Sequence, residues 1–207
     1  MPTDSFTYAW TVPTSGADVA LDDKFDLIIK ALDVGWFPKD ALDAKAEVLM
    51  SVTVTSGKEA RSWSALVKGV KADSALFDAK RMAYFVADNL PAARTGVRID
   101  LEMREVDNFE LLKKVLSALA DGSEFIKVIP VAGAVLGSIA DVGGALVGHI
   151  PDEVGKVFFS ATHNFVVKGG LAPYADVPLL KKGDVVCAST GPAGKGRKGS
   201  RLGLTVL

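Results

Sequence analysis

The sequence predicts a mainly β protein, an antiparallel β-sandwich interrupted by an α-helical hairpin. The first observation is a series of about eight or nine short β-prone segments separated by turn residues, which is typical of a sandwich. The second is a change from two-residue to helical periodicity after residue 106. The third is a hydrophobic content of 49% over 207 residues, enough for one sizeable core. We therefore expect a single domain, with the sandwich at 1–107 and 152–207 and the hairpin inserted at 108–151.

Alternating apolar residues mark the strands. They occupy every second position from Ala46 to Val54, and the turn residues Ser56 and Gly57 follow, so 63–67 are expected to complete a hairpin. From Val97 to Val106 aliphatic residues alternate with charged ones, which predicts that Arg98, Asp100, Glu102 and Arg104 point away from the core. Further strands are expected at 6–12, 25–32, 81–87, 156–167, 184–189 and 201–207.

The first arm of the predicted hairpin is an amphipathic helix. Its apolar residues recur at helical spacing, at Phe109, Leu112, Leu116 and Leu119. Asp107 and Glu110 have the spacing of a capping box, and Gly122 stands where the helix would end.

The second arm is expected to run from about Pro130 to just before Pro151. Asp141 is the only charged residue between Val128 and Ile150, a length that approaches the roughly 20 apolar residues of a membrane span. Small residues recur through the run at Gly133, Gly137, Ala140, Gly144 and Gly148, a pattern that lets a second helix approach closely. A charge at mid-membrane costs about 2.5 kcal/mol or more, which favours a packed helix or a subunit interface. Insertion into lipid remains the alternative.

Three segments together resemble C2 domains, the lipid-binding β-sandwiches. They are FDLIIKALDVGWFPKDALDAKAEVLMSV at 25–52, RMAYFVADN at 81–89 and GVRIDLEMREVDN at 96–108, and the resemblance covers about half of the chain. In that family two acidic loops that follow strands hold Ca²⁺ between them. The fuller series of aspartates found in the family after the second strand is absent here, and the predicted hairpin stands in its place.

The resemblance implies a calcium site formed by Asp33, Asp40, Glu105, Asp107 and Glu110. Calcium takes six to eight oxygen ligands, often from several carboxylates. These residues converge only if the topology is C2-like. The alternative for Asp107 and Glu110 is the capping box, and for Asp33 and Asp40 it is a solvated loop.

Two segments are candidates for contact with lipid or phosphate. Trp36 and Phe37 form an aromatic pair in a predicted loop, where they can enter an interface. Residues 191–201 form a glycine-rich basic loop that departs from the P-loop pattern, because Arg197 replaces the required lysine. Its cations, Lys195, Arg197, Lys198 and Arg201, form a candidate electrostatic patch for acidic lipid. A flexible hairpin loop is the alternative.

Composition narrows the classes of function. A net charge of −1 and a pI near 6.1 argue against a nucleic-acid-binding protein. Cys187 is the single cysteine, which fits a reducing, cytoplasmic location, peripheral to a membrane if lipid is bound. His149 and His163 lack zinc-ligand spacing, and no catalytic motif is present.

The leading hypothesis is a non-enzymatic C2-like module that binds a membrane or lipid surface, with Ca²⁺ as its candidate cofactor. The alternatives are a homo-oligomeric structural protein that uses the glycine-rich helix as its interface, and a pore-forming or toxin-like protein.

Overall fold

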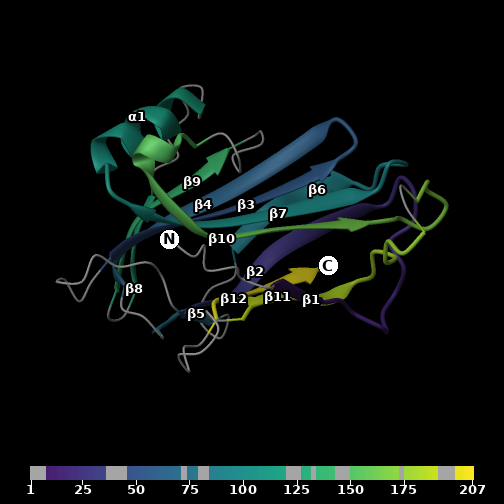
Figure 1. Ribbon diagram of the computed structural model, residues 1–207. Helices are drawn as coiled ribbons and strands as arrows, with labels where there is room; N and C mark the ends of the chain where they lie inside the picture. Colours follow the sequence, from purple (N-terminus) through teal and green to yellow (C-terminus); the bar gives the residue numbers. More distant parts are fainter. Residues whose placement is uncertain are drawn as a thin grey trace.

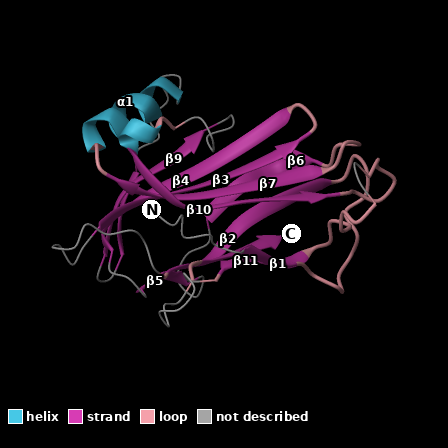
Figure 2. Ribbon diagram, viewed as in Figure 1, coloured by secondary structure: helices cyan, strands magenta, loops and turns pink. Residues whose placement is uncertain are grey.

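The computed structural model describes residues 8–35, 46–70, 74–78, 84–119, 127–131, 134–142, 150–172, 175–190 and 199–207. Within these ranges twelve strands form two antiparallel sheets, joined by one α-helix and one short 3-10 helix (Figure 1). Strands dominate the view coloured by secondary structure (Figure 2). The prediction of a mainly β, antiparallel protein is confirmed.

The first sheet is organised around its longest strand, β2. Its members are β1 (Tyr8–Thr11), β2 (Lys24–Val34), β5 (Ser74–Asp78), β6 (Tyr84–Pro91), β11 (Gly183–Ser189) and β12 (Arg201–Val206). The order is β1-β11-β12-β2-β5, and β6 also pairs with β2. β6 takes the first part of β2, from Lys24, and β5 takes the last part, up to Val34. The C-terminal strand β12 therefore lies beside β2, far from it in sequence.

The second sheet contains the β-hairpin predicted after Ala46 and the most clearly predicted strand, 97–106. Its members are β3 (Ala46–Ser56), β4 (Glu59–Val70), β7 (Val97–Val106), β8 (Lys127–Val131), β9 (Ala134–Val142) and β10 (Gly155–Phe165), in the order β10-β7-β3-β4-β9-β8. β3 and β4 turn at Gly57, whose φ of +62° suits glycine. β7 has the predicted bounds, and its apolar residues face the core. The alternate residues Asp100, Glu102 and Arg104 are buried as well, on the other face.

A single hydrophobic core lies between the two sheets. The cluster combines residues of the second sheet, such as Val52 and Leu101, with residues of the first, such as Leu27 and Leu204. Each is at most 1% exposed, and burying an aliphatic side chain of this size contributes about 1.5–3 kcal/mol. The sheets therefore pack face to face, as Figure 1 shows.

The first arm of the predicted hairpin is confirmed as α1 (Phe109–Leu119). Together with the 3-10 helix η1 (Asp152–Val154), it lies on the outer face of the second sheet (Figure 1). Leu112 of α1 packs there with Leu49 of β3 and Leu66 of β4. We call α1 and η1 the helical cap.

The predicted second helical arm is wrong, because residues 127–131 and 134–142 form β8 and β9. β9 extends the second sheet by pairing with β4, so this part of the predicted insertion belongs to the sheet. The physical reason is visible in the sequence. Each glycine costs a helix about 1 kcal/mol, whereas the Val and Ile residues of this run favour a strand. Hydrogen bonding to the edge of β4 then decides between the two. Residues 143–149 lie outside the described ranges.

β2 of the first sheet and β7 of the second end at the same side of the molecule. β6 leads into β7 through residues 92–96 alone, and Pro91 of β6 pairs with Lys24 at the start of β2. β2 and β7 therefore run in the same direction and finish at one end, which we call the α1 end. The opposite end, where β2 and β7 begin, we call the far end.

Candidate functional site

The α1 end brings together the bases of the two candidate lipid-binding segments. The backbone N–H of Gly35, just after β2, donates a hydrogen bond to Oγ of Ser200, just before β12, at 3.0 Å. Ser200 is 2% exposed, so this link is buried. Residues 36–37 follow Gly35 directly, and the basic segment 195–198 ends just before Gly199. The aromatic and basic segments therefore start from adjacent points on neighbouring strands.

The base of the basic loop is closed by two serines. Ser189 N–H donates to the Ser200 carbonyl at 2.9 Å, and Ser200 N–H donates to Ser189 Oγ at 2.9 Å. Gly199 makes the close approach possible, since a Cβ at this position would lie 1.5 Å from the Ser189 carbonyl oxygen. The two ends of the segment 191–198 are thereby held together at the sheet.

Of the predicted lipid-contacting residues, the structure describes Arg201. It stands opposite Asp33 in the β12–β2 ladder, and its Nη1 lies 3.7 Å from Asp33 Oδ2. Both side chains are substantially exposed, so this ion pair contributes little, within about 0–1 kcal/mol. Trp36, Phe37, Lys195, Arg197 and Lys198 lie outside the described residues.

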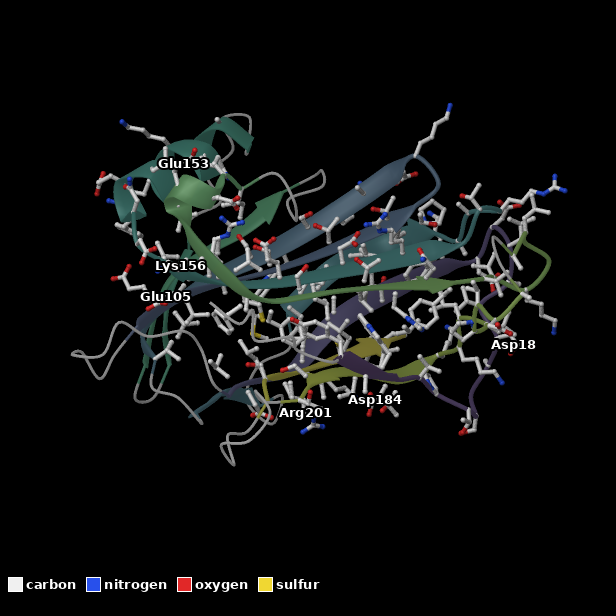
Figure 3. All side chains as sticks on the ribbon, viewed as in Figure 1. Asp18, Glu105, Glu153, Lys156, Asp184 and Arg201 are labelled. Atoms are coloured by element: carbon white, nitrogen blue, oxygen red, sulfur yellow. The ribbon has the colours of Figure 1, made fainter. Side chains whose placement is uncertain are left out.

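The predicted calcium ligands come from different sheets. Asp33 is on β2 of the first sheet, whereas Glu105 is on β7 of the second, opposite Lys156 of β10. Figure 3 shows Glu105 and Lys156 on one sheet and Arg201, the partner of Asp33, on the other. Within the described ranges no group of three or more His, Cys, Asp or Glu side chains is placed to hold a metal ion. Asp40 lies outside those ranges.

The capping box predicted for Asp107 and Glu110 is wrong. Asn108 is the N-terminal cap of α1, because its Oδ1 accepts a hydrogen bond from Leu111 N–H at 3.0 Å. Glu110 instead accepts a hydrogen bond from Lys113 Nζ, at 3.0 Å along the helix surface. The cap is one residue later than predicted because Asn108 is equally suited to it.

The predicted small-residue helix interface is not formed as such. Gly137 and Ala140 are residues of strand β9, where Gly137 falls at a register irregularity in the pairing with β4. Gly133, Gly144 and Gly148 lie outside the described residues. The predicted interface required a helix that brings small residues four apart close together, and the described part of this run is a strand instead.

The buried Arg104 of β7 fastens η1 to the sheet, and the sequence pattern did not reveal it. Arg104 of β7 donates from Nη1 to the carbonyls of Pro151 and Gly155, at 2.7 and 3.1 Å, and from Nε to Glu102 Oε1 at 3.2 Å. Asp152 of η1 lies 3.6 Å from the same guanidinium. Burial raises the pKa of Glu102 and outweighs the opposing effect of Arg104. Alternation predicted the direction of these side chains but not their burial.

The cysteine and one of the two histidines noted in the sequence lie in the described part of the chain. Cys187 is 1% exposed, and burial raises the pKa of its thiol to about 12, which makes it unreactive. His163 of β10 stacks on Trp10 of β1, with ring centroids 5.0 Å apart. His149 lies outside the described residues.

No protein-family model matches the chain, and no curated protein or solved structure matches it significantly. Among the described helices, none has the length and apolar character needed to cross a membrane.

Proposed function

We propose that the chain is a non-enzymatic, C2-like β-sandwich module that binds an anionic lipid surface with its α1 end. The observation that carries this proposal is the buried hydrogen bond between Gly35 and Ser200. It joins Gly35, which precedes the aromatic residues 36–37 in the chain, to Ser200, which follows the basic residues 195–198. An interfacial aromatic pair next to a cluster of cations suits the boundary between headgroups and acyl chains, where both kinds of contact are favourable.

The charge term is tested by reversing three cations of the basic loop. Each Lys or Arg near an anionic surface contributes about 1 kcal/mol. The triple variant Lys195→Glu/Arg197→Glu/Lys198→Glu should therefore bind on the order of 100-fold more weakly. The measurement is cosedimentation with vesicles of phosphatidylcholine alone and of phosphatidylcholine mixed with phosphatidylserine, at low and high salt.

The far end offers a matched control. Lys58, Arg94 and Lys182 are exposed there. The triple variant Lys58→Glu/Arg94→Glu/Lys182→Glu changes the net charge by the same amount at the opposite end of the sheets. It should retain most of the vesicle binding of the wild type. Equal losses of binding in the two triple variants would show that only net charge matters, against the proposal. Wild-type protein that does not bind vesicles containing phosphatidylserine would refute it.

The apolar and calcium contributions to vesicle binding are tested in separate experiments. Trp36→Ala/Phe37→Ala should weaken vesicle binding, and the loss should be similar at low and high salt. The contact removed is hydrophobic, and salt screens charge interactions only. Adding Ca²⁺ should strengthen binding if Asp33 and Asp40 hold the ion, and Asp33→Asn/Asp40→Asn should then abolish the gain. A solution mass measured alongside separates single-copy binding from the avidity of a homo-oligomer.

A further inference from the structure

An aromatic seam joins the edges of the two sheets on one side. β1 is one edge strand of the first sheet, and among the described residues it pairs with β11 over four residues, Tyr8–Thr11. β10 is one edge strand of the second sheet. Tyr8 meets Phe159 of β10 edge to face, with ring centroids 5.0 Å apart, and its hydroxyl accepts a hydrogen bond from Ser160 N–H at 3.3 Å. β1 thus spans both sheets.

His163 is the polar member of this seam. Its ring is stacked on Trp10, with 16° between the planes, and packs edge to face on Phe165 with centroids 4.7 Å apart. Its Nε2 is buried and has no hydrogen-bond partner. A neutral ring tolerates this position. An imidazolium would carry a second N–H donor and a charge into it without an acceptor for Nε2.

We propose that β1 is a pH-sensitive latch, held by neutral His163 and released from β10 and from β11 when His163 is protonated. β1 is the element that should open because it is short, lies at an edge, and depends on Tyr8 and Trp10 for its contacts with the second sheet. Its release would uncover the edge of β11 that pairs with β1. The two sheets would otherwise stay folded.

The groups around His163 do not offset its charge. In the described part of the chain, the ring faces Trp10 of β1 and stands opposite Ile99 of β7, while Cys187 of β11 is the strand neighbour of Trp10. Cys187 is neutral, since its pKa is raised to about 12. Asp100 and Arg98 point from the other face of the second sheet, and Asp184 and Lys30 pair with each other across the first sheet. Burial alone lowers the pKa of His163.

The direction of the effect follows from linkage. The open state exposes His163, which then titrates near its ordinary pKa of about 6.5. Because the pKa is lower in the closed state, the open state binds more protons below about pH 6.5. The latch is therefore fully closed above that pH and opens as the pH falls, until the pKa of the closed state is passed. Each tenfold difference between the acid dissociation constants of His163 in the closed and open states increases the equilibrium constant for opening of β1 by up to about tenfold.

Hydrogen–deuterium exchange of the backbone amides in Tyr8–Thr11 tests the latch. Rates are measured from pH 7.5 to pH 5 and corrected for the intrinsic pH dependence of exchange. The wild type should lose protection in this segment as the pH falls, while β3 and β7 keep theirs. His163→Gln, which stays neutral, should show protection that does not vary with pH. His149→Gln is the matched control, because the chain has two histidines, and it should respond as the wild type does.

A second measurement keeps the test decisive if His163→Gln folds poorly. The imidazole signals of His163 in the wild type, followed by NMR during a pH titration, give its pKa directly. A value at or above 6.5 would overturn the proposal. So would protection of Tyr8–Thr11 that is independent of pH in the wild type, or a pH response that persists in His163→Gln.

Discussion

The two faces of the second sheet are built by the same strands but are stabilised in different ways. The inner face is aliphatic, with Val52, Ile99 and Leu101 each at most 1% exposed in the common core. The outer face is buried in part by the helical cap, and its covered residues are mixed. Leu49 and Leu66 contact Leu112 of α1, while Arg104 holds η1 through hydrogen bonds.

Small hydroxyl residues continue the outer face beyond the helical cap. Thr53 and Ser62 share a hydrogen bond at 2.6 Å, and both are almost completely buried, as are Ser51 and Ser64. On the inner face burial itself is the stabilising term. On the outer face burial stabilises only where each polar group is satisfied. The outer face should therefore be the more sensitive one to loss of a single polar partner.

The largest expected effect is on the outer face, from Arg104→Leu. Removing one member of a buried ion pair typically costs about 3–5 kcal/mol, because the other charge stays buried. Here Glu102 would lose its partner and the Pro151 and Gly155 carbonyls would lose their donor. The free energy of unfolding from urea denaturation measures the loss.

A double variant distinguishes the ion pair from simple packing. Arg104→Leu/Glu102→Leu removes both charges, and replacing a whole buried pair by apolar residues is often close to neutral. The double variant should be more stable than Arg104→Leu alone. A double variant less stable than the single one would show that the outer face depends on shape, as the inner face does.

On the inner face, Leu101→Ala should destabilise by about 2–5 kcal/mol through lost burial and the cavity left behind. Leu101 faces Val52 and Ala161 on the adjacent strands. Ser160→Ala, at an exposed position next to Ala161, should stay within about 0.5 kcal/mol of the wild type. Urea denaturation of the two variants compares them, and equal losses would contradict the placing of the core between the sheets.

The sequence was sufficient for β7 because its pattern is periodic over ten residues. It was insufficient for β9, where glycine, alanine and valine lie together and no regular polar pattern marks the alternate face. Pairing with β4, a contact between residues distant in the chain, decides the structure there. Local propensity is commonly overridden in this way.

The candidate site, too, could be predicted only where a local sequence pattern marks it. The sequence identified the aromatic pair 36–37 and the basic segment 195–198 as two separate signals. Their common origin at the α1 end depends on β12 pairing with β2, a strand order that no local pattern encodes. The seam of Trp10 and His163 is a contact of this kind as well, since the two residues lie on different sheets.

The buried carboxyl of Glu102, on the outer face, should give stability a pH dependence of its own. The pKa of Glu102 is raised in the folded protein, so the folded state keeps its proton at a higher pH than the unfolded state does, for which the ordinary value is 4.5. Its contribution is therefore fully favourable below about pH 4.5 and is lost as the pH rises through the folded pKa. The loss amounts to about 1.4 kcal/mol for every tenfold difference between the acid dissociation constants of the two states.

Glu102→Gln isolates that contribution. The free energy of unfolding of the wild type, minus that of Glu102→Gln, should fall as the pH is raised above 4.5 and then level off. Thermal or urea denaturation at several pH values gives the difference. A difference that instead grows with pH would mean that Arg104 outweighs burial and that the pKa of Glu102 is lowered.

The smallest of these effects concerns the start of α1, at the border of the outer face. Asn108 Oδ1 satisfies the Leu111 N–H, and replacing an asparagine cap by alanine costs about 1 kcal/mol, with a range of about 0.5–2. Asp107→Ala is the matched control, since Asp107 precedes the cap and is the residue that the sequence pattern favours for it. It should change the free energy of unfolding by no more than about 0.5 kcal/mol. Because Leu112 anchors the helical cap on Leu49 and Leu66, loss of the Asn108 hydrogen bond should also increase amide exchange in α1 while leaving the inner-face strands protected. A larger loss for Asp107→Ala than for Asn108→Ala would restore the capping box and shift the start of the helix by one residue.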